Sequence, residues 1–232
     1  MTVRCEVDDQ DILTVTLDDG DKNTLRPETF DALIAALDDH PQAVAVLLQG
    51  REGILSAGLD LRWMTEHGRD GVERLLIGFG ACLMRWWTDP RPTVCAATGH
   101  AIAAGSMLAM ACDHAVATEG GFWGLTETRV GLEVPDFGIA LARANLPPDR
   151  LEDLLIPGER IDAATAAADG FADVLAPDAA TAVSLARSRV EELATLPARA
   201  YAGTKRRLRG AAAEAVLTGL HDDISGLTAH LV

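Results

Sequence analysis

GHAIAAGSMLAMACDHAVA, residues 99–117, joins a glycine-containing turn, an apolar helix and a strand without any spacer. We expect a turn at 98–101, a helix over 103–111 and a strand over 114–118. TVCAA at 93–97 comes directly before this stretch and is expected to form a buried strand. Strands that alternate with helices indicate an α/β domain with a parallel or mixed sheet.

The residues before this stretch repeat the same alternation of strands and helices. AVAVLLQ at 43–49 is a continuous apolar run, as expected of a strand buried on both faces of a sheet. REGILSAGLDL at 51–61 is expected to be a loop that leads into a helix from Asp60. The other expected elements of this half are strands over 12–17 and 122–125, a helix that begins at Pro27 and a helix over 72–87.

The residues after about 135 have a different composition, because strand patterns nearly vanish and alanine-rich helical patterns take over. We expect a core over 1–140 and a C-terminal helical region over 141–232 that packs on the core or on a neighbouring subunit. The expected helices of this part are 136–144, 148–155, 162–169, 178–194 and a last one from about 197.

The chain has 232 residues, which suits one domain with a full hydrophobic core. Its formal net charge of −15 argues against nucleic acid or an anionic membrane as a partner, so an anionic substrate needs a local basic cluster. The four cysteines are far apart and without metal-ligand spacing, so they are expected to be reduced core residues.

No targeting segment is expected at the N-terminus, which reaches acidic residues within ten positions and has no apolar run. The most apolar stretch, Val94 to Cys112, is interrupted by Thr98, Gly99 and His100, which argues against a membrane span. The expected compartment is therefore the cytoplasm.

Two glycine-containing turns lie before expected helices, SAGLD at 56–60 and GHAIAAG at 99–105. Each presents backbone N–H groups at a helix start, where a negatively charged oxygen is favoured. If the two turns converge, their N–H groups form an oxyanion hole, although either turn alone is also common for packing reasons.

Four segments in order resemble the crotonase superfamily of enoyl-CoA hydratases and isomerases. LSAGLDL (55–61) is similar to the first oxyanion segment of that family, and 99–117 is similar to the second. GLTETRVGLEVP (124–135) resembles the segment in which mitochondrial-type Δ3,Δ2-enoyl-CoA isomerases carry their catalytic glutamate, and IDAATAAADGFADVLAP (161–177) extends the match. The resemblance implies an α/β spiral of repeated ββα units with a C-terminal helical trimerisation region, hence a trimer or a dimer of trimers.

The resemblance also implies roles for individual residues. The oxyanion donors fall at the backbone N–H groups of Leu59 and Ala104, and the two acid/base positions fall at Met107 and Glu127. Since Met107 is not ionisable, one carboxylate remains, which suits the transfer of a proton from C2 to C4 of a 3-enoyl thioester better than the addition of water. We expect burial to raise the pKa of Glu127.

Three alternatives stay open at this stage. Asp136 lies near the position at which some relatives carry a hydrolytic aspartate, but it also suits a helix start. A hydratase would use Glu127 alone or with Asp136, and a non-catalytic acyl-CoA-binding module is the alternative from another class. His100, His114, Asp60 and Asp113 are expected to be structural, and Glu133 a surface residue.

The expected substrate is an acyl-CoA thioester, with coenzyme A as part of the substrate and no separate cofactor or metal. The resemblance places adenine along the backbone of Ser56, Ala57 and Gly58 and a cation near the CoA phosphates at Arg62. Lys22 and the basic run at 205–209 could add positive charge, although solvation of a helix surface also explains that run. No dinucleotide, P-loop or zinc motif appears.

Overall fold

The computed structural model describes residues 2–229, and its larger sheet has six strands. In sheet order these are β1 (Thr2–Val7), β2 (Ile12–Asp18), β3 (Ala45–Gly50), β5 (Thr93–Ala97), β7 (His114–Thr118) and β10 (Val174–Ala176). β1 and β2 pair antiparallel, and every other neighbouring pair is parallel.

The smaller sheet has four strands, and its first three run parallel. They are β4 (Gly53–Ser56), β6 (Gly99–Ile102) and β8 (Phe122–Gly124), followed by the antiparallel β9 (Ile161–Asp162). The consecutive pairs β3 and β4, β5 and β6, and β7 and β8 each send one strand to each sheet. This is the spiral of repeated units that the sequence predicts.

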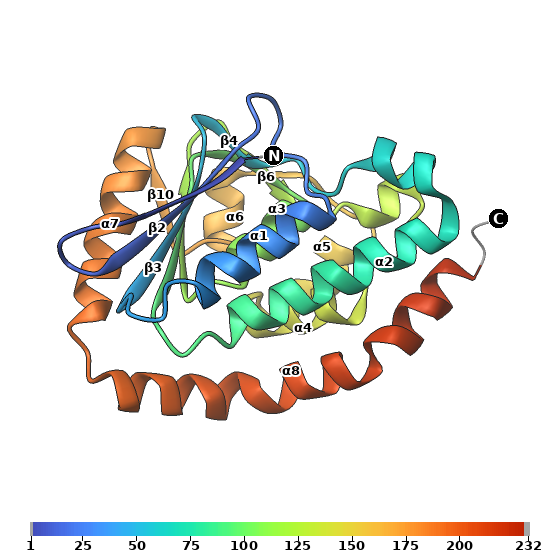
Figure 1. Cartoon of the computed structure of the whole chain (residues 1–232). Coiled ribbons are helices and arrows are strands. Elements are labelled where there is room, and N and C mark those ends of the chain that lie inside the picture. The colour runs from blue at the N-terminus through green and yellow to red at the C-terminus, as the bar shows by residue number, and fades with distance from the viewer. Residues whose placement is uncertain (1, 230–232) are drawn as a thin grey trace.

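The helices surround these sheets. They are α1 (Pro27–Asp38), α2 (Leu61–Trp87), α3 (Ala104–Met110), α4 (Asp136–Asn145), α5 (Leu151–Leu155), α6 (Ala163–Asp169), α7 (Ala179–Ala194) and α8 (Ala198–Thr228), with a 3-10 helix η1 (Glu127–Val130). Figure 1 shows α7 against one side of the larger sheet and α1 and α2 on the other. α8 runs beneath α2 and α4 along the length of the molecule.

The strand β3 is buried on both faces, as its continuous apolar run predicts. Val46 and Leu48 belong to the main core, whereas Ala45 and Leu47 pack in a second cluster with α7. That cluster includes Ala182, Ala186 and Val190, whose spacing puts them on one face of α7. The C-terminal helical region therefore covers the outer face of the larger sheet.

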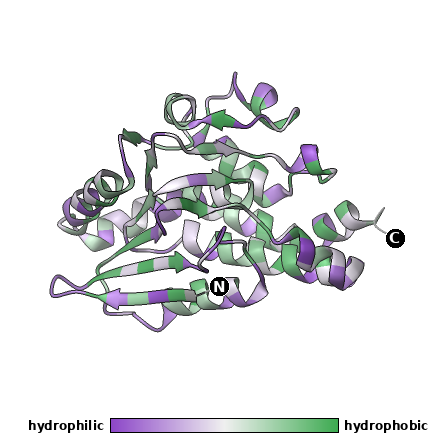
Figure 2. Cartoon of the chain, turned by 90° about the horizontal axis from the view of Figure 1, so that it is seen from above, coloured by the Kyte–Doolittle hydropathy of each residue, from purple (hydrophilic) through white to green (hydrophobic). Residues whose placement is uncertain are grey.

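Five strands were not expected from the sequence, and two of them, β9 and β10, lie in the part of the chain where strand patterns nearly vanish. Residues 53–56 and 99–102, expected to be a loop and a turn, are β4 and β6. Each has four residues, too few for a clear period of two, and each forms by pairing with the other. β1 alternates apolar and charged residues, as Figure 2 shows, and pairs along its length with β2 as an edge strand.

Two helix predictions also change. The helix from Asp60 and the helix over 72–87 are joined into α2, with a break at Gly68, where φ is 60° and ψ is −167°. Only glycine adopts such a backbone conformation readily, and this explains why the pattern is interrupted there. α5 begins at Leu151 rather than at 148, since Pro147 and Pro148 precede it.

The C-terminal region is joined to the core through both sheets. β10 pairs with β7 in the larger sheet, and β9 pairs with β8 in the smaller one. The division at residue 140 stays a prediction. Among residues 2–229, no helix combines the length and apolar character needed to cross a membrane.

Candidate active site

Three neighbouring parallel strands of the smaller sheet deliver three groups to one edge. β4 leads to Leu59, β6 leads to Ala104, and β8 leads to Glu127. Because the carboxyl ends of parallel strands lie at the same edge of a sheet, these residues meet. All three line one cavity together with Met107. The motifs at 55–61, 99–117 and 124–135 thus converge in space.

The two glycine-containing turns approach each other too closely for larger residues. A Cβ atom on Gly105 would lie 2.5 Å from the backbone oxygen of Ser56. Gly58 has φ of +97°, and a Cβ atom there would lie 3.1 Å from the Ile102 oxygen and 3.6 Å from the Ala104 nitrogen. Both glycines are therefore required for this contact, and Gly58 leaves free the space beside the Ala104 N–H.

The N–H groups of Leu59 and Ala104 have no hydrogen-bond acceptor among residues 2–229. The groups around Leu59 are used, since Gly58 accepts from the Leu25 N–H and the Asp60 N–H donates to Leu25. Ala104 is the first residue of α3, where an N–H has no partner within the helix. Two free N–H groups in adjacent turns suit an oxygen that becomes negatively charged.

Ala103 holds a strained backbone conformation that aims the second turn. Its φ of 50° and ψ of −116° are unusual for a residue with a side chain. The Ala103 N–H donates to the oxygen of Gly124, at 2.7 Å, which fixes the turn against the end of β8. Strain of this kind is typical of functional sites.

Ser106 is a positioning residue that the sequence analysis missed. Its buried hydroxyl donates to the Ala101 oxygen, at 2.6 Å, and accepts from the Gly124 N–H, at 3.1 Å. It thereby ties the start of α3 to the strand end that carries Glu127. A hydroxyl within the apolar run AIAAGSMLAM was the available signal.

Glu127 is a buried carboxylate, and one of its oxygens lacks a hydrogen-bond partner within residues 2–229. Its residue is 8% exposed, and its Oε2 atom has no hydrogen-bond partner among the described residues. Burial raises its pKa to about 7, against a smaller opposing effect of its own backbone N–H. This agrees with the pKa expected from the sequence, and a carboxyl with that pKa can take and return a proton near neutral pH.

The cavity around Glu127 is mainly apolar, with Glu133 and Thr228 as its other polar lining residues. Met107 is fully buried in its wall and offers no ionisable group. The space open to the centre of a water molecule is about 30 Å³, so the cavity is narrow. Its other apolar lining residues are Leu59, Leu76, Phe79, Ala104, Leu132, Pro135, Phe137 and Leu227.

The two further carboxylates near the site differ in position. Glu133, predicted to be a surface residue, is indeed exposed but also lines the cavity. Asp136 is exposed at the start of α4 and is not among the lining residues. Its backbone N–H donates to the Asp223 carboxylate, and its own carboxylate has no hydrogen-bond or ion-pair partner among residues 2–229. The structure therefore brings Glu133, and not Asp136, to the cavity of Glu127.

The segment 56–58, expected to contact adenine, is held by the turn at 22–23. The Ala57 N–H donates to the Lys22 oxygen, and the Ser56 hydroxyl donates to the Asn23 oxygen, at 2.6 Å. Asn23 is buried at a φ of 50°, and its amide donates to the oxygens of Leu17 and Leu55. Asparagine tolerates this left-handed conformation, and this was the signal for its role.

Two exposed cations flank the first turn. Lys22 adjoins Ala57, and Arg62 lies in the first turn of α2. Neither forms an ion pair with any residue in 2–229, so both charges are available to an anion. Arg26 is different, because its guanidinium pairs with the buried Asp60 at 2.5 Å.

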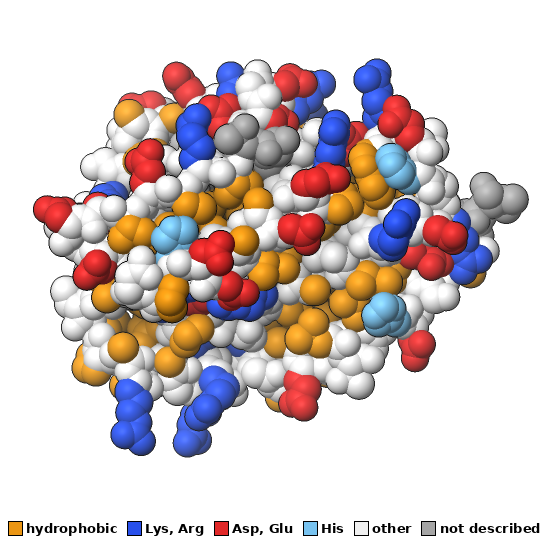
Figure 3. Space-filling model, viewed as in Figure 1, with side chains coloured by type: hydrophobic (Ala, Val, Ile, Leu, Met, Phe, Trp, Pro, Cys, Tyr) orange, Lys and Arg blue, Asp and Glu red, His pale blue; other side chains and the backbone are white. Residues whose placement is uncertain are grey.

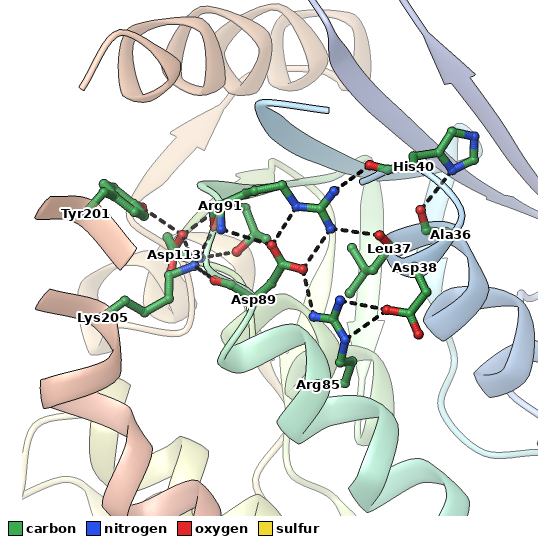
Figure 4. A network of polar contacts seen from close by, with 11 residues as sticks. Ala36, Leu37, Asp38, His40, Arg85, Asp89, Arg91, Asp113, Tyr201 and Lys205 are labelled. Atoms are coloured by element: carbon green, nitrogen blue, oxygen red, sulfur yellow. Dashed lines mark hydrogen bonds and ion pairs between the residues drawn. The ribbon is translucent and has the colours of Figure 1, made fainter. Parts of the chain in front are cut away.

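The basic run at 205–209 is divided by the fold. Lys205 is buried, and its ammonium group donates to the oxygens of Asp89 and Arg91 and to the Asp113 carboxylate, as Figure 4 shows. Arg209 also pairs with Asp113. These two residues are structural, so they are unavailable to the CoA phosphates, contrary to that prediction. Basic side chains do project along the edge that α8 forms (Figure 3), and Arg206 and Arg207 are exposed there.

The residues predicted to be structural behave as such. Asp113 accepts hydrogen bonds from Lys205, Arg209 and Tyr201, and His100 accepts one from the Phe122 N–H. Asp60 caps α2 by accepting from the Trp63 N–H.

Comparisons with known proteins agree with this geometry. The family model described as enoyl-CoA hydratase/isomerase matches residues 8–230. A Thermus thermophilus protein with a provisional enoyl-CoA hydratase name is 35% identical over 196 residues, 82% of this chain and 77% of that protein. The apo structure of a Mycobacterium tuberculosis enoyl-CoA isomerase is 30% identical with a TM-score of 0.87, covering 99% and 98%. Human mitochondrial Δ3,Δ2-enoyl-CoA isomerase shares the fold, with a TM-score of 0.93 at 23% identity over 98% and 90%.

Proposed function

Because the chain belongs to the enoyl-CoA hydratase/isomerase family, we propose that it isomerises 3-enoyl-CoA thioesters to trans-2-enoyl-CoA thioesters. One observation carries this proposal. Among the described residues that line the cavity, Glu127 is the one buried ionisable side chain, and the neutral Met107 is buried in its wall, where the resemblance implies the family's other acid/base position. A single carboxyl is sufficient to move a proton between two carbons of the same substrate.

The chemistry begins with the ionised Glu127, whose oxygen removes a proton from C2 of the thioester. The electrons of the C–H bond move toward the thioester oxygen, which gives a dienolate. The N–H groups of Leu59 and Ala104 donate to that oxygen, and such a donor is typically worth about 3 to 4 kcal/mol in the transition state. Glu127 then returns the proton to C4, so the double bond shifts and no atom is gained or lost.

The burial of Glu127 supports both halves of this cycle. With a pKa of about 7, a substantial part of the carboxyl is ionised at neutral pH and can act as the base. The protonated form is then a strong enough acid to protonate C4. The apolar walls keep bulk water from quenching the dienolate.

Hydration of a 2-enoyl-CoA is the second candidate. It requires a water molecule that is held and activated, for which hydratases of this family use two glutamates. The buried Met107 supplies no such group. The observation in favour of hydration is that Glu133 lines the same cavity, where it provides a second carboxylate near the mouth.

The CoA moiety would lie across the first turn. We assign its adenine to the backbone of Ser56, Ala57 and Gly58 and its phosphates to Lys22 and Arg62, whose charges are unpaired among the described residues. We further propose that the chain assembles as a trimer or a dimer of trimers, which light scattering of the purified protein would test.

A direct assay separates the candidates. The wild type and Glu127→Gln, Glu133→Gln and Asp136→Asn variants are compared on 3-hexenoyl-CoA and crotonyl-CoA, with the exposed Glu28→Gln as the matched control. Isomerisation that is lost in Glu127→Gln and kept in the others supports the proposal. Isomerisation unchanged in Glu127→Gln would refute the mechanism. Faster hydration of crotonyl-CoA that depends on Glu133 would favour the hydratase, and CoA binding without either activity would favour a binding module.

A further inference from the structure

The walls of the Glu127 cavity differ in how firmly they are held, and the difference bears on the length of the acyl chain. One wall is aromatic and comes from α2 and α4, where Phe79 and Phe137 meet edge to face at 5.6 Å. A Cβ atom on Gly80 would lie 2.7 Å from the Phe137 ring and 2.8 Å from a Leu220 methyl. The side chains behind this wall are closely packed, so the acyl chain cannot extend through it.

The wall around α3 is equally tight. A Cβ atom on Gly138 would lie 2.8 Å from the terminal methyl group of Met107 and 2.8 Å from a Val134 methyl. The Met107 side chain is therefore packed closely against α4. An acyl chain that passes Glu127 cannot extend in this direction.

The last turn of α8 forms a further wall, beside the segment that contributes Leu132, Glu133 and Pro135. Leu227 and Thr228 line the cavity, although they lie 100 residues after Glu127 in the chain. The Thr228 hydroxyl donates to the Glu73 carboxylate at 2.7 Å, and Glu73 is itself paired with Arg69. Glu73 belongs to the part of α2 that follows the break at Gly68. The Thr228 Oγ1 also lies 2.9 Å from the Ile224 oxygen of its own helix, so its contact with Glu73 adds to the packing of α8 on α2 in holding the last turn.

We propose, resting on the proposed function, that the substrates are short-chain acyl-CoA thioesters and that Leu227, held by the Thr228 to Glu73 hydrogen bond, sets the length limit. The open space of about 30 Å³ has room for on the order of two or three water-sized groups. Because Leu59, Ala104 and Glu127 line this space, the reacting carbons themselves occupy it, and little of it remains for a longer acyl tail. A longer chain has to displace the last turn of α8.

The test is a chain-length series of 3-hexenoyl-, 3-octenoyl- and 3-decenoyl-CoA with the wild type and Leu227→Ala. For the wild type we expect kcat/KM to fall at least about tenfold between the six-carbon and the ten-carbon substrate. One methylene group that fits a pocket contributes about 1 kcal/mol, and the extra methylene groups of the decenoyl chain lose this contribution because they find no space in the cavity. Leu227→Ala should raise the decenoyl to hexenoyl ratio about tenfold. Leu217→Ala is the matched control, because Leu217 lies on the same helix but is 47% exposed.

A second variant tests the hydrogen bond without a change of volume. Thr228→Val keeps the shape of the side chain and removes the donor to Glu73. We expect the decenoyl to hexenoyl ratio to rise, mainly through a lower KM for the longer substrate. An unchanged ratio in both Leu227→Ala and Thr228→Val, or a wild type that accepts ten carbons as well as six, would overturn the proposal.

Binding of saturated acyl-CoA separates this inference from the proposed function. Calorimetry with hexanoyl- and decanoyl-CoA measures the same length limit without any turnover. Tight binding of hexanoyl-CoA, weak binding of decanoyl-CoA and no isomerisation would refute the isomerase and keep the length limit. Equal affinity for the two thioesters, together with active isomerisation, would refute the length limit and keep the isomerase.

Discussion

Two carboxylates of this molecule have buried side chains, and their surroundings are opposite. Glu127 is 8% exposed and leaves Oε2 without a hydrogen bond. Asp113 is partly exposed as a residue, but its side chain is only 8% exposed and accepts hydrogen bonds from Lys205, Arg209, Tyr201 and the Thr93 N–H. An isolated buried charge is unstable, whereas a buried charge with good partners is tolerated. Partners, more than burial, therefore distinguish the reactive carboxyl from the structural one.

The two carboxylates also lie in different parts of the molecule. Asp113 connects α8 to the segment between α3 and β7, far along α8 from the end that lines the cavity. It belongs to a network that continues through Lys205 and Asp89 to Arg85 and Asp38, seen in Figure 4. Glu127 lies instead in a mainly apolar cavity, and its Oε2 atom has no hydrogen-bond partner among the described residues.

The largest expected effect is on catalysis by Glu127. Glu127→Gln should lower kcat/KM for 3-hexenoyl-CoA isomerisation about 10²- to 10⁴-fold, because it removes the acid/base group and keeps the shape of the side chain. Asp113→Asn, assayed on its folded fraction, should stay within a few-fold of the wild type. Similar losses in both variants would contradict the distinction between the two carboxylates.

The oxyanion contact should be the next most sensitive feature. A Cβ atom in Gly58→Ala would crowd Ala104 and would also meet the unfavourable φ of +97°. We expect a loss of kcat of about 10²- to 10³-fold, similar to the removal of one oxyanion donor. Gly203→Ala on α8, where a Cβ atom has open space, is the control. Full activity in Gly58→Ala would rule out this turn as the oxyanion site.

The stability of the fold should depend on Asp113. Asp113→Asn leaves the buried ammonium of Lys205 without its carboxylate, and we expect a loss of about 3 to 5 kcal/mol in the free energy of unfolding. Urea denaturation at pH 7 measures this loss. Asp153→Asn, which breaks a surface ion pair with Arg150, should cost less than about 1 kcal/mol. Equal costs would show that the Asp113 network is not structural.

Removal of the reactive carboxyl should stabilise the protein. The pKa of Glu127 is raised from 4.5 to about 7 on folding, so the folded state holds this proton more tightly. This tighter proton binding adds to the free energy of unfolding. Its contribution is complete below pH 4.5 and is lost as the pH rises through 7. At pH 8, Glu127→Gln should therefore be more stable than the wild type by about 3 kcal/mol, and near pH 4 the two should be equal.

The smallest effect should follow a change at Asp136. Its exposed side chain does not line the cavity, so Asp136→Asn should keep the isomerisation rate within about twofold, the range of ordinary surface substitutions. A large loss of activity would instead revive the hydrolytic role that the sequence left open.

The sequence indicates the motif that carries Glu127, but it does not predict the pairing of Asp113 with Lys205, because these residues are far apart in the chain. The resemblance of three short motifs to the family indicates Leu59, Ala104 and Glu127 as candidate site residues, and the fold brings all three to one cavity. Lys205 is misassigned, since its partners Asp89, Arg91 and Asp113 are about 90 to 120 residues away and only the folded chain brings them together. A basic run indicates charge, but the packing of α8 decides which charges reach the solvent.

The short strands and the cavity wall also depend on contacts between distant residues, which local sequence patterns do not predict. β4 and β6 have four residues each, and their pairing with each other is a tertiary contact that local periodicity does not encode. Leu227 and Thr228 enter the cavity only because α8 extends along α2. Local patterns therefore identify the reacting groups, while the walls that select the substrate depend on the whole fold.

The most direct test of the central claim is the pH dependence of kcat/KM for 3-hexenoyl-CoA isomerisation between pH 5 and 9. A base with the pKa of Glu127 predicts a rate that rises about tenfold per pH unit below the inflection and reaches a plateau above a pKa of about 7. The Asp113→Asn variant should show the same inflection. A profile that is flat across this range, or that has its inflection near pH 4.5, would contradict the assignment of Glu127 as the buried, unpartnered base.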